Sequence, residues 1–327
     1  MKGNVNNKTA ELRNLIFREI LSGTYQVGEK LPAEREMAER YSLSRVTVRR
    51  AYENLEQSGI VIRKQGLGTC VADFCRANSY SGNIIGLLIN GADRFAWDFI
   101  REIETQVRLL GGLLVLRLTD DDAQLEESAA IDLVGQGIQN LIIWASGKDF
   151  KSETFERLRV LGTNMVFFDR MIPGDYADYV GVDNNDIMEK LFDKAPKNIE
   201  KALFLNHRIP FDSDKLREKY FVRQCGNRGI APTVKRIDYA ELKNINYQEF
   251  DAVFCVNDDM AMQVYELDSE IMLFGIDGLC HKFVSYRQPM KMMAERIIEL
   301  LNRQRLSGDK WKSRKIFEKG EICEKVQ

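Results

Sequence analysis

The chain has 327 residues, of which 44% are hydrophobic and 29% are charged, so it can bury the cores of two or three domains. Its first residues, MKGNVNNKTAELRN, hold no apolar stretch of signal-peptide length, and no later run approaches a membrane span; we therefore expect a cytoplasmic protein. The formal net charge is −2, but residues 1–76 carry +4 and the remainder −6, a distribution that suits an anionic polymer at one end of the molecule.

Two helices are predicted near the N-terminus. Apolar residues recur at helical spacing over 12–21, and Ser22-Gly23 supplies a stop. The segment LPAEREMAERY predicts a second helix, opened by Pro32, with acidic residues in its first turns. The residues expected to face the core are Leu12, Leu15, Ile16, Ile20, Ala33, Met37 and Tyr41.

A third helix follows after the short turn 42–44, which is the arrangement of a helix-turn-helix. Ser44 can cap this helix, and one face carries an apolar stripe. Arg45 and Arg49 form an i, i+4 pair off the stripe, with Thr47 and Arg50 expected to point outward, so this helix can reach phosphates and base edges together. The stripe consists of Val48, Ala51, Tyr52 and Leu55.

The segment IVIRKQGLGTCVAD contains two short β-rich runs around a basic, glycine-containing tip, the pattern of a wing hairpin. From about Leu12 to Val71 the sequence resembles the GntR-family winged helix without a gap. The resemblance departs at Cys70, where the family usually has an aromatic residue, which affects wing packing rather than DNA contact. It implies that the chain contacts DNA through Arg35, Ser44, Arg45, Thr47, Arg49 and Gly66.

Residues 73–82 are small and polar and read as a linker between a DNA-binding domain, 1–72, and a larger domain, 83–327. In that domain, predicted strands alternate with helices, which indicates an α/β fold with parallel sheets. A first set runs from NIIGLLIN to NMVFFD and a second from YVGVD to IMLFGID, so two lobes are expected, the second beginning at YVGVD.

Polar and aromatic groups stand at the carboxyl ends of the predicted strands, where ligands bind in open α/β sheets. Carboxylates and amides accept hydrogen bonds from sugar hydroxyls, a guanidinium donates to sugar oxygens, and an aromatic face covers the apolar C–H surface. The groups at the strand ends are Asn90, Trp144, Asp169, Arg170, Asn257, Asp258 and Asp277.

From about Asn83 to Val326 the order of short motifs resembles the lactose-repressor/galactose-repressor effector domain, which is similar to periplasmic sugar-binding proteins. These motifs include RFAWDFIREIE, MVFFDR, YVGVDNND, AVFCVNDDMA and MLFGIDG, whereas KAPKNIEKALFLNHR lacks the family's usual Gly-His element. The combination with a GntR-type head is similar to arabinose-repressor-type regulators and implies a homodimer that binds operator DNA under control of a monosaccharide. The implied ligand contacts are Phe95, Asp169, Arg217, Asn257, Asp258 and Asp277, with Gln288 at the rim.

Catalysis finds little support, since neither histidine has metal-ligand spacing and no nucleophile elbow, P-loop or dinucleotide-binding motif occurs. We expect a regulator rather than an enzyme, with no cofactor and no metal, and reduced cysteines, because the six cysteines form no CxxC pair. The alternatives left open are a non-sugar effector and an enzyme-like C-terminal domain. A transport-type sugar-binding protein is disfavoured by the DNA-binding head and by the absent signal peptide.

Overall fold

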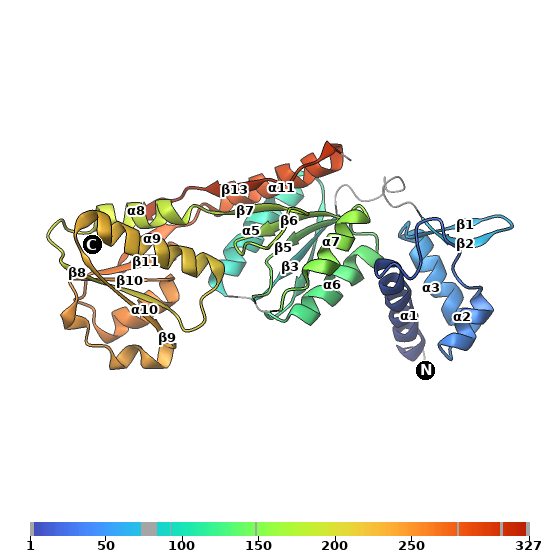
Figure 1. The fold of residues 1–327 in the computed structure, drawn as a ribbon, viewed down its shortest axis with the longest axis horizontal. Coiled ribbons are helices and arrows are strands. Elements are labelled where there is room, and N and C mark those ends of the chain that lie inside the picture. The colour runs from blue at the N-terminus through green and yellow to red at the C-terminus, as the bar shows by residue number, and fades with distance from the viewer. Residues whose placement is uncertain are drawn as a thin grey trace.

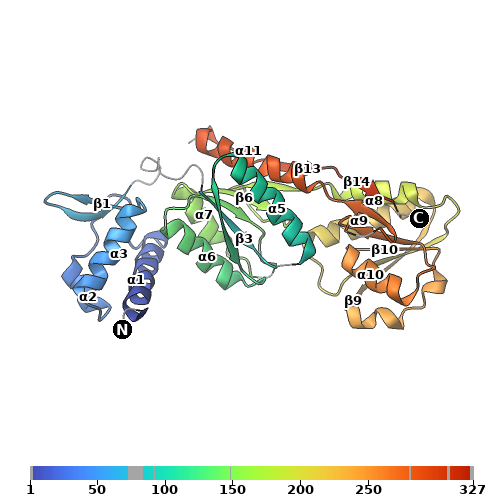
Figure 2. The ribbon, with the colours of Figure 1, turned by 180° about the vertical axis from the view of Figure 1, so that it is seen from behind.

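The computed structural model of the protein describes residues 3–72, 84–91, 93–147, 149–279, 281–307 and 310–324. The predicted linker, Cys75 and Cys280 lie outside these residues. Figures 1 and 2 show an elongated molecule in which the N-terminal head, a first lobe and a second lobe follow one another along the long axis.

The head is a helix-turn-helix followed by a hairpin, as predicted. Ser44 caps the third helix by accepting a hydrogen bond from Thr47 N at 3.1 Å. The second helix begins at Glu34, two residues after Pro32, because Ala33 has extended backbone and acts as the N-cap residue. The elements are α1 (Gly3–Leu21), α2 (Glu34–Arg40), α3 (Arg45–Gln57), β1 (Val61–Lys64) and β2 (Gly68–Val71).

The core of the head contains the predicted stripe of α3, whose four residues are all buried. On α1, Leu12, Ile16 and Ile20 are buried as expected, but Leu15 is 43% exposed, so its assignment to the core was wrong. Phe17 is buried instead. It lies against Gly135 of the first lobe, a contact that helical periodicity within the head cannot reveal.

The first lobe is a six-stranded, fully parallel sheet in the order β13-β7-β6-β5-β3-β4. Helices α5 and α11 cover one face, and α6 and α7 the other. The elements of this lobe are β3 (Ile84–Ile89), α5 (Arg94–Leu109), β4 (Leu113–Leu118), α6 (Ala123–Gly135), β5 (Asn140–Ile143), α7 (Ser152–Val160), β6 (Asn164–Phe168), β7 (Asp178–Val182), α11 (Met290–Ser307) and β13 (Lys315–Glu318).

The second lobe contains a six-stranded sheet in the order β14-β12-β11-β10-β8-β9, parallel except for β14, which runs antiparallel to β12. Its core combines the buried strands β8 and β10 with the apolar faces of α8, α9 and α10. The elements are α8 (Asn184–Lys194), β8 (Lys201–His207), α9 (Asp212–Arg228), β9 (Ala231–Ile237), η1 (Tyr239–Asn244), η2 (Tyr247–Glu249), β10 (Ala252–Cys255), α10 (Asp258–Leu267), β11 (Leu273–Ile276), β12 (Val284–Arg287) and β14 (Glu321–Cys323).

The boundary between the lobes differs from the prediction. Strand β7, which contains the YVGV of this motif, pairs with β6 and β13 and so belongs to the first lobe rather than the second. The described chain crosses between the lobes after β7, after β12 and after β13. Three chain segments thus connect the lobes next to the cleft, and such connecting segments can act as a hinge.

The return of the C-terminal segment to the first lobe is fixed by Asp178, a fully buried carboxylate at the start of β7. It accepts hydrogen bonds from the side chains of Arg303 at 2.7 Å, Gln304 at 2.8 Å and Trp311 at 3.2 Å, and from Arg314 N at 2.7 Å. Each carboxylate oxygen of Asp178 therefore accepts two hydrogen bonds, which compensate for the burial of its charge.

Candidate functional site

The exposed face of α3 carries the arginines expected to contact DNA. Arg45 and Arg49 are both exposed. Arg49 forms an ion pair with Glu34 of α2 at 3.1 Å, while Arg35 pairs with Glu39 on the exposed side of α2, also at 3.1 Å. A phosphate or a base edge would have to replace Glu34 as the partner of Arg49.

Thr47 does not point outward as predicted. Its side chain is buried, with its hydroxyl 2.8 Å from the Ser44 hydroxyl. The hydroxyls of this pair cap α3, so Thr47 can orient the start of the recognition helix but presents little surface to a partner.

The wing is the antiparallel hairpin β1–β2, in which Val61 lies opposite Val71 and Lys64 opposite Gly68. Gly66 at its tip has φ of +79°, and a Cβ there would meet no atom within 4 Å. Glycine is thus favoured by backbone conformation rather than by space. Cys70, on β2 of this hairpin, is a buried free thiol, as are Cys225, Cys255 and Cys323 in the second lobe.

A cavity of about 260 Å³ lies between the lobes at the carboxyl ends of the strands. The strand-end groups predicted from the sequence meet there, with the exception of Asp258. The residues that line the cavity are Asn90, Gly91, Asp93, Phe95, Trp144, Asp169, Arg170, His207, Phe211, Ser213, Asp214, Arg217, Asn257, Asp259, Asp277, Leu279 and Gln288.

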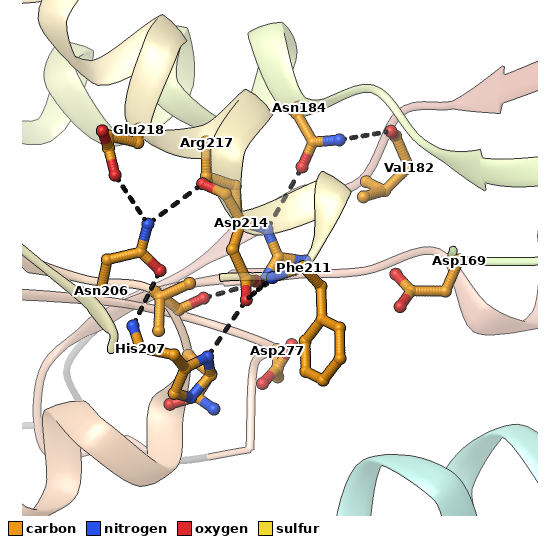
Figure 3. A network of polar contacts seen from close by, with 12 residues as sticks. Asp169, Val182, Asn184, Asn206, His207, Phe211, Asp214, Arg217, Glu218 and Asp277 are labelled. Atoms are coloured by element: carbon orange, nitrogen blue, oxygen red, sulfur yellow. Dashed lines mark hydrogen bonds and ion pairs between the residues drawn. The ribbon is translucent and has the colours of Figure 1, made fainter. Parts of the chain in front are cut away.

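Arg217 is the central cation of this cavity and lies almost fully buried on α9 (Figure 3). Its Nε donates to Asn184 Oδ1 at 3.2 Å and its Nη1 to Val256 O at 2.8 Å, with Asp214 Oδ1 at 3.8 Å. These contacts join α8, α9 and the end of β10, so the guanidinium is held in place before any ligand arrives.

Asp214 sets the position of His207, whose Nδ1 lies 3.1 Å from its Oδ2 (Figure 3). Burial tends to raise the pKa of Asp214, but the hydrogen bond from His207 and the positive charge of Arg217 outweigh it and hold this pKa below its usual range. Asp214 is therefore charged near neutral pH and already compensated by Arg217.

Asp169 enters the cavity from the first lobe. It adopts a left-handed backbone with φ of +59°, and Trp144 Nε1 donates to its Oδ2 at 3.2 Å. Burial raises the pKa of this carboxyl, opposed by the charges of Arg217 and Arg170. Trp144 and Phe168 pack around Phe95, whose ring centroid lies 5.4 Å from that of Trp144, so carboxylate and aromatic surfaces adjoin.

Asp277 and Gln288 form the opposite wall, and Gln288 Nε2 donates to Asp277 Oδ1 at 2.8 Å. Burial, followed by the charge of Asp258, raises the pKa of Asp277 well above its usual value. Gln288 is only 3% exposed, so its prediction as a rim residue was wrong, and its Oε1 has no hydrogen-bond partner among the described residues. An unsatisfied buried acceptor beside a cavity is suited to a ligand hydroxyl.

Asp258 does not line the cavity, contrary to the prediction. It is buried behind Asp277, where it accepts hydrogen bonds from Leu279 N at 2.7 Å and the Ser285 hydroxyl at 2.6 Å. Its neighbour Asn257 caps α10 through Met260 N at 2.9 Å and faces the cavity, so capping and lining are combined in Asn257 instead.

Sequence reasoning missed Phe211, the residue before α9. The Arg170 guanidinium lies 3.5 Å from the centroid of its ring, which joins the two lobes across the cleft. A Cβ at Gly147 would lie 2.6 Å from the ring, so this contact requires glycine there. Phe211 lies in the stretch where the family resemblance is weakest, and no periodicity distinguishes it from a core residue.

Among the described residues, no cluster of histidine, cysteine and acidic side chains could hold a metal ion, and no helix is long and apolar enough to cross a bilayer.

Comparisons with known proteins agree with this arrangement. Residues 8–71 match the family model for bacterial regulatory proteins of the gntR family. Over 144 residues, the chain is 31% identical to the arabinose metabolism transcriptional repressor of Geobacillus stearothermophilus; the match covers 44% of this chain and 40% of that protein. The chain thus spans well under half the length of this relative.

Solved structures resemble the two lobes. A periplasmic binding ribose operon repressor protein from Lactobacillus acidophilus aligns with a TM-score of 0.63 and 17% identity, covering 75% of this chain and 98% of that one. The dimeric Lac repressor aligns with a TM-score of 0.62 and 15% identity, covering 74% and 97%. Residues 8–71, which the structure shows as a winged helix-turn-helix, thus match the gntR family model, and the two lobes share the fold of these LacI-type structures, as both resemblances predicted.

Proposed function

We propose that this chain is a bacterial transcriptional regulator, acting as a repressor of sugar-utilisation genes, whose head binds operator DNA and whose interlobe cleft binds a small effector. The observation that carries the proposal is that a gntR-family head and a polar, aromatic-lined cleft occur in one chain. The relative from Geobacillus stearothermophilus is named as a repressor of arabinose metabolism. A protein that binds operator DNA acts in the cytoplasm, where we expect this one.

At the head, the proposed base-reading residues are Arg45 and Arg49, since a guanidinium matches the O6/N7 edge of guanine. Arg35, Ser44 and Gly66 are proposed to contact the backbone, and Thr47 to support Ser44. One winged helix reads one half-site, so we propose a homodimer on a near-palindromic operator.

In the cleft, a monosaccharide or a close derivative fits the lining groups. Asp169 and Asp277 supply acceptors, Arg217 supplies donors, and the ring of Phe95 offers an apolar surface for C–H groups. Asn257 and Gln288 add amide groups that can bond further hydroxyls. A sugar that binds the closed arrangement ten times better at each of two sites would change operator affinity roughly a hundredfold.

The test has two parts. Selection of duplexes from random DNA by the purified protein should give a near-palindromic sequence, and thermal melting with L-arabinose, D-ribose, D-xylose, D-glucose and lactose should give one sugar that raises the melting temperature. Arg217→Ala should abolish that shift, whereas Arg157→Ala, which removes an exposed ion pair with Glu153 remote from the cavity, should retain it. No selected sequence would refute the DNA-binding function, and no stabilising sugar would favour a non-sugar effector.

A further inference from the structure

The head is not merely tethered to the first lobe, because α1 packs against α6 and α7, as Figures 1 and 2 both show. Buried residues of the head and of α6 belong to one continuous apolar cluster, to which Phe17 and Val134 both contribute. Polar contacts accompany this packing. Ser58 Oγ donates to Gly135 O at 2.6 Å, and Arg18 Nη2 donates to Ser128 Oγ at 3.1 Å.

Asp132 of α6 forms the ion pair that joins the first lobe to the head. Its carboxylate forms an ion pair with Arg13 of α1, whose side chain is only 8% exposed, and another with Arg117 of β4 at 2.8 Å. The first pair joins the head to the lobe, and the second lies within the lobe. A buried arginine whose partner belongs to another domain favours one docked orientation, since undocking would leave Asp132 with half of its compensation.

The opposite end of α6 holds the loop beside the cleft. Glu126 is fully buried and accepts a hydrogen bond from Ser146 N, and Asp121 accepts one from Gly147 N at 3.0 Å. Asp121 also forms an ion pair with Arg170, the residue that stacks on Phe211 of the second lobe. The contact between the lobes is thus bonded to the start of α6.

We propose that α6 couples closure of the cleft to the orientation of the head. Asp121, two residues before α6 begins, holds Arg170, which contacts Phe211, and the last turn of α6 holds α1. The helix has 13 residues, so a span of about 20 Å separates the two ends. A short helix packed into a core moves as a rigid body, and a shift at one end repositions the other. This inference rests on the proposed function for its biological role, but the coupling itself requires neither DNA nor sugar.

Coupling is reciprocal, which gives a direct test by hydrogen exchange on the full chain. Arg13→Ala removes the ion pair at the head end, and Asp121→Asn removes the one at the cleft end. We expect Arg13→Ala to speed exchange in residues 12–21 about tenfold and also to speed exchange at Ser146 and Gly147 several-fold. Asp121→Asn should give the converse pattern.

Arg117→Ala is the matched control, because it removes a partner of the same Asp132 carboxylate but no contact with the head. In this variant, hydrogen exchange in residues 12–21 and at Ser146 and Gly147 should match the wild type. If Arg13→Ala lowers overall stability, Ser58→Ala repeats the test. It removes the hydroxyl that Gly135 O and Asn54 O share, each at 2.6 Å, and leaves every charge in place. Exchange that rises only at the altered end, or in neither segment, would overturn the proposal.

The regulatory role is tested separately with the selected operator and whichever of the five sugars raises the melting temperature. Arg13→Ala and Asp121→Asn should reduce the sugar-induced change in operator affinity from about a hundredfold towards unity, while Arg117→Ala retains it. Full retention in both variants would overturn the role of α6. An absent response in the wild type would refute the proposed function and leave the exchange result to decide the coupling.

Discussion

Replacing Asp277 with asparagine should stabilise the protein while weakening its effector binding. In the described part of the chain, no lysine or arginine nitrogen forms an ion pair with Asp277, whose donor is the amide of Gln288 at 2.8 Å. Asparagine keeps that bond, has nearly the same shape as aspartate and so adds no new backbone strain at the φ of +125°, and removes a buried charge next to Asp258. We expect a gain of about 1–3 kcal/mol, or roughly 2–4 °C of melting temperature per kcal/mol.

The gain should depend on pH, and its sign follows from the raised pKa of Asp277. A carboxyl with a raised folded-state pKa contributes stability at low pH that is lost as the pH rises through that pKa. The advantage of Asp277→Asn should therefore be smallest near the ordinary pKa of aspartate, about 4, and grow as the pH is raised in thermal melting. Sugar affinity should fall roughly 10- to 150-fold with the loss of a charged acceptor. A variant less stable than the wild type at pH 8 would refute the reasoning.

The remaining predictions concern other parts of the chain. Asp178→Asn, a matched change at a buried carboxylate with four donors, should lower the free energy of unfolding by about 3–5 kcal/mol, measured by denaturant titration. Arg45→Ala and Arg49→Ala should each cost about 1–3 kcal/mol of operator affinity, and wild-type affinity should fall about a thousandfold between 50 and 200 mM salt if ~6 phosphates are contacted; a flat salt profile would remove DNA as the ligand. Burial raises the pKa of Glu126 to about 7, so stability from this group is lost as the pH rises through 7, and Glu126→Gln should flatten the profile between pH 5 and 8 by on the order of 3 kcal/mol. Sedimentation should show a dimer at micromolar concentration, and a monomer with and without operator would contradict the half-site argument.

The sequence predicted most of the fold because its signals are local. Period 3.6 in α3, a capping serine at 44 and continuous apolar runs in β3 and β5 each identify an element without knowledge of its neighbours. Strands β12, β13 and β14 escaped prediction, since they are short and partly exposed. The membership of β7 also escaped, because the sheet that a strand joins depends on tertiary pairing and not on its own pattern.

For the cleft, the rule that strand ends carry the ligand groups was sufficient to gather Asp169, Asn257 and Asp277 in one cavity. It could not separate Asp258 from Asp259, because adjacent residues at a helix start point in different directions and only packing decides which one faces the ligand. Phe211 and Gly147 were beyond its reach for another reason: their contact joins two lobes, so the sequence around either residue gives no sign of it.

The same limit explains why the arrangement of the head could not be foreseen. Arg13 and Asp132 are separated by 119 residues, and each alone reads as a solvated helix charge. Only the docked structure shows that Arg13 is buried and that Asp132 serves the head and β4 at once. If the helix that carries Asp132 also carries the groups that hold the cleft loop, then ligand affinity and head orientation share one element, and any free-energy difference that a sugar creates between open and closed lobes is available to the head. Such a difference moves the head only if the docked head makes contacts with α6 that the undocked head lacks. The Arg13–Asp132 ion pair is such a contact, so its loss should be the first to separate movement of the cleft loop from movement of the head.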